Sequence, residues 1–300
     1  MRIGLITSAP DHPLLAAAGA LLTARGHRVE ALDPAHPPAA GDAPPADVYL
    51  LKARTPAALA LARSLEERGA PVVNPAAATA LCQDRTAMAD LARRAGLPFA
   101  PTRTADSPAA LLAAAEAGDL ALPLVVKSRH SRRDDLVARA DDLARLRALA
   151  EQWPGEAVVA QPYLPSTGWD QKLWVVAGQL FCTRRRSELA DPGPARPPHG
   201  GDAFGPHDLP AERARLALRV GEVFGLDVYG VDLLDGPDEP VVVDVNAFPG
   251  IRGQAGAPEA LAALALRAAE AGRPSPPAPS ALPGPREGDP ADAQPDAAAR

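Results

Sequence analysis

The sequence has 300 residues, 47% of them hydrophobic, and this length allows two domains or three small modules with a sizeable core. The formal net charge of -6 argues against a general nucleic-acid-binding protein, which would normally be basic. Cys82 and Cys182 show neither a disulfide framework nor the spacing of a zinc site. No stretch approaches the length of a membrane span, and the first apolar run is too short for a signal peptide, so we expect a cytoplasmic protein that binds no membrane.

Short apolar runs alternate with helix-like segments in the first quarter of the chain. Strands are predicted at 2–7, 27–32, 47–52 and 71–74. Helices are predicted between them at 13–25 and 56–68. This alternation predicts a parallel α/β sheet, and the absence of a GxGxxG sequence leaves a dinucleotide site without support.

The remaining elements are less regular. Asp84 is predicted to cap a helix over 85–95 that ends at Gly96. Strands and hairpins are predicted at 123–128, 157–164, 173–183 with a turn at Ala177-Gly178, 228–234 and 240–246. Helices are predicted at 141–152, 211–224 and 258–271. Residues 273–300 contain eight prolines and no apolar period, which predicts a disordered tail.

Two carboxylates and an amide are predicted to converge on one face of the last hairpin. Strand side chains alternate between faces, so Asp244 and Asn246 point the same way, and a turn near 237–238 places Asp232 almost opposite Asp244. Two like charges on an apolar hairpin are costly, and a hard cation with oxygen ligands would compensate them. Because Mg²⁺ is normally shared with substrate phosphates, a nucleotide is the expected partner. The alternative is a surface hairpin with two solvated Asp residues.

Lys127 lies in the apolar strand PLVVKS, where its charge is costly unless it meets an anion. The alternative is a lysine on an edge strand that reaches water. The following loop, SRHSRRDD, could contact phosphates or simply be solvated; its basic residues are Arg129, His130, Arg132 and Arg133.

An apolar strand then leads into the proline-containing segment AQPYLPSTGWD, as an interdomain hinge requires. Exposed backbone there can hydrogen-bond an adenine edge, and Asp170 could accept from ribose hydroxyls. Further on, LFCTRRRSEL places Arg184 and Arg186 on one face of a strand end, where arginine suits a multiply charged oxyanion. A solvated basic strand end is the alternative.

Taken in order, these features resemble the ATP-grasp superfamily over roughly residues 75–255, most strongly in GVDLLDGPDEPVVVDVNAFPG. Within the superfamily the chain is most similar to the RimK-type carboxylate–amine ligases. The resemblance implies an α/β (α+β ATP-grasp) fold with nucleotide bound between two subdomains. The expected division is an N-terminal α/β module at 1–75, a central subdomain at 76–162, a C-terminal subdomain at 163–272 and the tail at 273–300.

The resemblance also implies cofactors and residue roles. The cofactors would be ATP and Mg²⁺, with Mn²⁺ able to replace Mg²⁺. The expected ATP-binding residues are Lys127 at the phosphates, Asp170 at the ribose, Gln161, Pro162, Tyr163 and Leu164 at the adenine, and Arg85. The expected magnesium ligands are Asp232, Asp244 and Asn246. Lys172 and Arg186 would face the phosphates and the acyl-phosphate as catalytic residues.

Two departures from the ligase pattern keep other functions open. Arg85 stands where the family usually has Lys, and the loop SRHSRRDD lacks the usual glycines. The basic loop and the sequence DVNAFPG also resemble the inositol trisphosphate kinases, which would phosphorylate a polyol hydroxyl. A non-catalytic ATP-binding scaffold is a third reading. For the ligase we expect small-molecule or peptide carboxylate and amine substrates, no nucleic acid, and by analogy a homo-oligomer.

Overall fold

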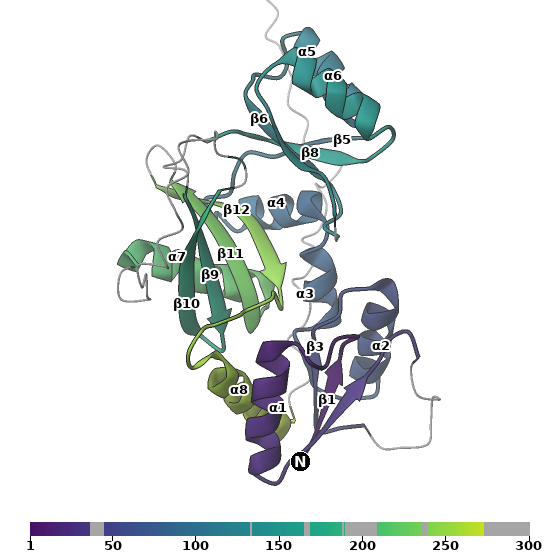
Figure 1. Ribbon diagram of the computed structural model, residues 1–300, viewed down its shortest axis with the longest axis vertical. Coiled ribbons are helices and arrows are strands. Elements are labelled where there is room, and N and C mark those ends of the chain that lie inside the picture. Colours follow the sequence, from purple (N-terminus) through teal and green to yellow (C-terminus); the bar gives the residue numbers. More distant parts are fainter. Residues whose placement is uncertain are drawn as a thin grey trace, which may run out of the picture.

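The computed structural model describes residues 1–36, 45–132, 134–164, 169–187, 189, 209–235 and 239–272, with the backbone alone at 169, 170, 184–186 and 235. Within these residues the chain forms three four-stranded sheets, stacked along an elongated molecule (Figure 1). Some predictions lie outside the described residues: the tail at 273–300, Arg133, the turn at 237–238 and the side chains of Asp170 and Arg186.

The first sheet confirms the predicted N-terminal parallel module. Its strand order is β2-β1-β3-β4, and all neighbouring strands are parallel. The strands are β1 (Arg2–Ile6), β2 (Arg28–Leu32), β3 (Val48–Leu51) and β4 (Val72–Val73).

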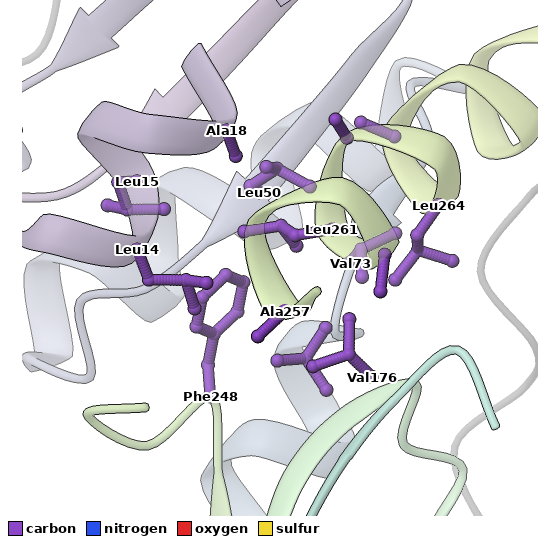
Figure 2. Close-up of a cluster of buried hydrophobic side chains, with 14 of the residues drawn as sticks. Leu14, Leu15, Ala18, Leu50, Val73, Val176, Phe248, Ala257, Leu261 and Leu264 are labelled. Atoms are coloured by element: carbon purple, nitrogen blue, oxygen red, sulfur yellow. The ribbon is translucent and has the colours of Figure 1, made fainter. Parts of the chain in front are cut away.

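Helices cover both faces of this sheet. Helix α1 (Pro13–Ala24) and the last helix, α8 (Ala257–Ala271), lie on one face, and α2 (Pro56–Glu67) lies on the other. Because side chains alternate along β3, neighbouring residues join different cores. Leu50 joins the core under α1 and α8 (Figure 2), and Leu51 joins the core under α2. The C-terminal helix therefore packs on the N-terminal module.

The second sheet is antiparallel, with strand order β5-β8-β6-β7. Its strands are β5 (Arg103–Ala105), β6 (Leu124–Ser128), β7 (Val137–Ala140) and β8 (Val158–Pro162). Helices α5 (Pro108–Glu116) and α6 (Leu143–Gln152) pack on one face (Figure 1). No element is predicted from the sequence for β5, α5 or β7, although Ser107 caps α5 by accepting from the Ala110 N–H at 3.3 Å.

The third sheet is also antiparallel, with strand order β10-β9-β11-β12. Its strands are β9 (Trp169–Val176), β10 (Gln179–Arg186), β11 (Val228–Asp235) and β12 (Pro240–Ala247). The β9–β10 hairpin turns at Ala177 and Gly178 as predicted, and both residues have the positive φ of a type I′ turn, 52° and 80°.

Three helices connect and support this sheet. Helix α3 (Ala76–Leu81) leads from the first sheet to α4 (Arg85–Arg94), and α7 (Ala211–Phe224) precedes β11. Both α4 and α7 contribute to the core under the sheet. As predicted, Asp84 caps α4, accepting from the Thr86 and Ala87 N–H groups at 2.9 and 3.3 Å. No helix in the described part of the chain combines the length and apolarity needed to cross a bilayer.

Candidate active site

A cleft with a volume of about 270 Å³ lies between the second and third sheets, formed by β6 and β8 on one side and β9, β11 and β12 on the other. Its lining includes every predicted site residue whose side chain the structure describes. These residues are Arg85, Lys127, Gln161, Pro162, Tyr163, Leu164, Lys172, Asp232, Asp244 and Asn246. Residues scattered over 160 positions of sequence therefore meet in one concave site.

The acidic hairpin has the predicted geometry. Asp232 of β11 pairs directly with Asp244 of β12, and Asn246 follows on the same face two residues later. The register shifts between Asp232 and Leu233, which pairs with Val242, so Val243 is an extra residue on β12. The Val243 carbonyl accepts a hydrogen bond from Lys127 Nζ at 3.0 Å. The bulge thus fixes the buried lysine beside the acidic pair.

Each carboxylate of the pair has a cationic neighbour. Lys172 Nζ lies 2.5 Å from Asp232 Oδ2, and these two residues are cross-strand partners of β9 and β11. Arg85 Nη2 lies 3.6 Å from Asp244 Oδ2. Burial raises the pKa of the Asp232 carboxyl, against the lowering effect of Lys172 and with a further rise from Asp244. Two carboxylates so close together need this positive charge.

The donor set of the hairpin fits a magnesium ion. Asp232, Asp244 and Asn246 offer only oxygen ligands from one side, which suits a hard cation that keeps waters and shares substrate phosphates. Among the described residues no group of three or more His, Cys, Asp or Glu side chains is gathered as a metal site. A two-carboxylate, one-amide set is incomplete by itself and leaves coordination positions for phosphate oxygens.

Lys127 is a central-strand lysine. Strand β6 lies between β7 and β8, and only 7% of Lys127 is exposed, which excludes the edge-strand alternative. Burial lowers the pKa of Lys127, whereas the charge of Asp244 raises it. A cation held in this way lies in the cleft beside the acidic hairpin, where it can neutralise an anionic ligand.

The residues of the predicted adenine hinge line the cleft. Gln161 is 4% exposed and donates to Thr102 Oγ1 at 3.1 Å, and the Tyr163 N–H donates to the Pro123 carbonyl at 3.0 Å. The Tyr163 ring stacks under Arg139, whose Cζ lies 4.0 Å from the ring centroid. These contacts rigidify the strand that leads out of the second sheet.

Apolar and hydroxyl side chains of the cleft were not singled out from the sequence. They are Val125, Ser131, Val137, Ser187, Leu189, Leu233 and Leu234, together with Gln171 and Val243. Period-two alternation would have found Val125, two residues before Lys127 on the same strand face. Val137 lies on a strand that was not predicted. The apolar members come from both the second and the third sheet and give the cleft lining an apolar part.

Arg85 connects three parts of the site. Its Nη1 donates to the Ser128 carbonyl and to Asp135 Oδ2, each at 2.7 Å, and its Nη2 is the group near Asp244. The side chain is buried, and its Nε has no hydrogen-bond partner among the described residues. Arg85 therefore ties the loop after β6 to the acidic hairpin.

The basic loop after β6 is held by carboxylates. Arg129 makes three hydrogen bonds of 2.7 to 3.2 Å to Asp84, and Arg132 makes two of 2.6 and 3.0 Å to Glu156. The bond from Arg132 lowers the pKa of Glu156. The described arginines of this loop thus already have anionic partners.

Asp170 and Arg186 are placed through their backbones alone. Both lie at the end of the β9–β10 hairpin away from its turn, where Asp170 pairs with Arg185 and Arg186 pairs with Trp169. Lys172, two residues after Asp170, lines the cleft. The roles predicted for Asp170 and Arg186 stay predictions.

Fold and cleft together define an ATP-grasp protein, with the cleft between the second and third sheets. Residues 82–260 match the model of the RimK-like ATP-grasp domain, and the chain belongs to this family. The predicted resemblance and the predicted α+β fold class are confirmed.

Curated relatives include two probable alpha-L-glutamate ligases. The protein from Alcanivorax borkumensis is 30% identical over 204 residues, and that from Thioalkalivibrio sulfidiphilus is 28% identical over 200 residues. Each match covers 65% of this chain and 65% of the relative, so the chain spans slightly less than two-thirds of the length of these relatives.

Solved structures share the fold over most of the chain. The RimK domain ATP-grasp protein from Sphaerobacter thermophilus is 26% identical with a TM-score of 0.67, covering 89% of this chain and 100% of that one. The ATP-grasp ligase PsnB, solved with a minimal precursor, Mg and ADP, has a TM-score of 0.63 at 19% identity, covering 89% and 97%. At 19% identity, the similarity to PsnB shows a shared fold and no more.

Proposed function

We propose that this protein is a Mg-ATP-dependent carboxylate–amine ligase that acts through an acyl-phosphate. The observation that carries the proposal is the cross-strand pair Asp232 and Asp244, set in a cleft together with the buried Lys127. A cleft of this kind concentrates positive charge on phosphate oxygens, and positioning and charge neutralisation dominate phosphoryl transfer.

In this proposal the nucleotide lies between the second and third sheets. The adenine occupies the apolar end near Gln161, Pro162, Tyr163 and Leu164, with Asp170 at the ribose. Asp232, Asp244 and Asn246 hold Mg²⁺, which would neutralise charge on the β- and γ-phosphates. Lys127 contacts the phosphates from β6, and Arg85 supports the site through its link to Asp244.

The chemistry has two balanced steps. A substrate carboxylate oxygen attacks the γ-phosphorus, the bond to the β-phosphate oxygen breaks, and ADP leaves. The amine nitrogen then attacks the acyl carbon, phosphate departs with its oxygen, and the nitrogen loses a proton as the amide forms. Lys172, placed beside Asp232, and Arg186, at the end of β10, are proposed to stabilise the charge on the transferred phosphoryl group.

The described loop contacts favour the ligase over the polyol kinase. A kinase for inositol phosphates needs several cations that converge on the acceptor beyond those serving ATP. Arg129 and Arg132 are instead bound to Asp84 and Glu156. The support for the scaffold reading is that Arg85 stands where the family usually has Lys. The intact acidic pair argues against this reading.

The names of the relatives suggest which substrates to test. We propose small-molecule or peptide carboxylates and amines, with glutamate the first to test because the curated relatives are named glutamate ligases. We further propose the division into units at 1–75, 76–162 and 163–272, a cytoplasmic location and a homo-oligomeric state.

The test is ADP release from Mg-ATP in the presence of amino acids, short peptides and inositol phosphates, each alone and in pairs. ADP that forms only when a carboxylate and an amine are both present supports the ligase. ADP that forms with an inositol phosphate alone would establish the kinase instead.

A further inference from the structure

Asp135 is a carboxylate that lies just behind the candidate active site. Its Oδ2 accepts a hydrogen bond from Arg85 Nη1 at 2.7 Å, and its side chain is 13% exposed. Arg85 belongs to the lining of the cleft, whereas Asp135 does not. Asp135 therefore reaches the cleft through the guanidinium that it holds.

The backbone of the loop after β6 fixes Asp135 independently of Arg85. The Ser128 N–H donates to the Leu136 carbonyl at 2.8 Å, and the Leu136 N–H donates to Ser128 Oγ at 3.0 Å. The preceding residue, Asp134, has a φ of 57°, in the left-handed region that Asp adopts more readily than most residues. This closed loop places Asp135 beside the Ser128 carbonyl, which accepts from the same Nη1 at 2.7 Å.

Arg85 is anchored at its main chain as well. It is the first residue of α4, and its N–H donates to the Arg129 carbonyl at 2.9 Å. Its side chain is only 7% exposed, and it crosses from this helix to the loop and ends near Asp244. Both sides of the contact between Arg85 and Asp135 are thus fixed, which leaves the guanidinium little freedom to turn while the contact is made.

The two terminal nitrogens of Arg85 differ in their contacts. Nη1 makes two hydrogen bonds of 2.7 Å, whereas Nη2 is 3.6 Å from Asp244 Oδ2, which is too long for a hydrogen bond. An arginine beside a carboxylate ordinarily closes to about 2.7–2.9 Å, often through two parallel hydrogen bonds. The contacts of Nη1 therefore hold Nη2 back from full pairing with Asp244.

Full pairing with Arg85 would make Asp244 a poorer metal ligand. Mg²⁺ requires oxygen ligands at about 2.0–2.1 Å in a nearly octahedral arrangement, so a carboxylate engaged by an arginine must first be released. The positive charge of the arginine would oppose the cation as well. Lysine has a single nitrogen and cannot form a bidentate pair, so the need for a restraint comes with the arginine at position 85.

We propose that Asp135 is a positioning residue, which holds Arg85 away from Asp244 and so leaves the Asp244 carboxylate available to the metal ion. The inference rests on the proposed function for the role of Asp244 as a magnesium ligand. Loss of the Asp135 charge releases Nη1, the guanidinium turns to Asp244, and the metal ion then has to displace it.

The experiment measures Mn²⁺ binding to the full chain with saturating ADP, by water proton relaxation, which distinguishes protein-bound Mn²⁺ from Mn²⁺ on free ADP. D135N removes the charge and keeps the shape, and D135E restores the charge. The matched control is D134N, because Asp134 is an exposed aspartate one residue earlier in the same loop. R85Q and the double variant R85Q/D135N complete a double-mutant cycle. D244N reports whether Mn²⁺ binds at the acidic hairpin.

We expect Mn²⁺ affinity to fall at least tenfold in D135N, to change less than twofold in D134N and to return to within threefold of the unmodified chain in D135E. In the R85Q background, D135N should change the affinity less than twofold, because no arginine is present to be released. A role of Asp135 through its own charge or through general packing would instead weaken binding equally in both backgrounds.

Three results would overturn the proposal. They are equal Mn²⁺ affinity in D135N and the unmodified chain, equal weakening by D135N with and without Arg85, and a D135N variant that does not fold, since Asp135 would then serve the fold. Unchanged Mn²⁺ affinity in D244N would overturn the magnesium assignment and this inference with it. Because no turnover is measured, failure of the ligase activity is a separate result.

Discussion

Replacement of Asp244 by asparagine tests the acidic hairpin with the smallest change of shape. Asparagine keeps one oxygen but removes one of the two carboxylate charges facing each other on β11 and β12. The lost interaction is that between the Asp244 carboxylate and a bound cation. Two opposite unit charges about 4 Å apart attract by about 4 kcal/mol at an effective dielectric constant of about 20. If roughly two-thirds of this energy acts on the transition state, the barrier rises by about 2.7 kcal/mol, which is about 100-fold in kcat.

The same change should leave the fold nearly intact. The Asp244 side chain is 14% exposed, and its partner Arg85 retains Asp135 and the Ser128 carbonyl at 2.7 Å. We therefore expect a loss of stability of about 1 kcal/mol or less, or roughly 2–4 °C in Tm.

The assay is initial-rate ADP release as a function of Mg²⁺ concentration, with Tm measured in parallel. D119N is the matched control, because Asp119 is exposed at the end of α5 and outside the cleft lining. Turnover and Mg²⁺ dependence equal to those of the unmodified chain would refute the magnesium assignment. A loss of turnover accompanied by unfolding would refute the claim that Asp244 serves the ligand and not the fold.

Four further predictions concern single features. K127M should lower kcat/KM for ATP by about 100-fold, since it removes a cation opposite the phosphates, and unchanged ATP kinetics would contradict this. F248A should cost about 3–5 kcal/mol in chemical denaturation, because this fully buried ring joins the hairpin loop to the first sheet, and a cost below 1 kcal/mol would contradict that packing. Arg132 lowers the folded-state pKa of Glu156, so the pair stabilises the fold above the ordinary Glu pKa of about 4.3, and this contribution disappears as pH falls through the folded pKa. E156Q should therefore lose up to about 1 kcal/mol of stability at pH 7 and nothing at pH 2; an equal loss at both pH values would point to packing instead. Truncation after Gly272 should leave Tm unchanged, and a fall of many degrees would show that the Pro-rich tail docks on the domain.

Local patterns were sufficient for the elements that depend on neighbouring residues. The turn at Ala177 and Gly178, the cap at Asp84 and the pairing of Asp232 with Asp244 all follow from spacing within one hairpin or one helical turn. Short or exposed elements have too few apolar residues at regular spacing to be predicted from the sequence. Strand β7, for example, has four residues, and its first, Val137, is exposed although it is apolar.

Long-range contacts could not be predicted from local spacing. Arg129 and Arg132 form ion pairs with carboxylates 45 and 24 residues away in the sequence. The sequence around the loop therefore shows only its basic residues and not their partners. The converse holds for Lys52. Its Nζ lies 5.9 Å from the ring centroid of Phe248, a residue 196 positions away that belongs to the core of the first sheet.

The central claim is phosphoryl transfer to a carboxylate, and isotope transfer tests it most directly. The carboxylate substrate found in the ADP-release scan is labelled with ¹⁸O in both oxygens, and the released phosphate is analysed by mass spectrometry. An acyl-phosphate route predicts one ¹⁸O atom in each phosphate and one in the amide product. Phosphate without label, formed at the same rate as ADP, would contradict the ligase mechanism.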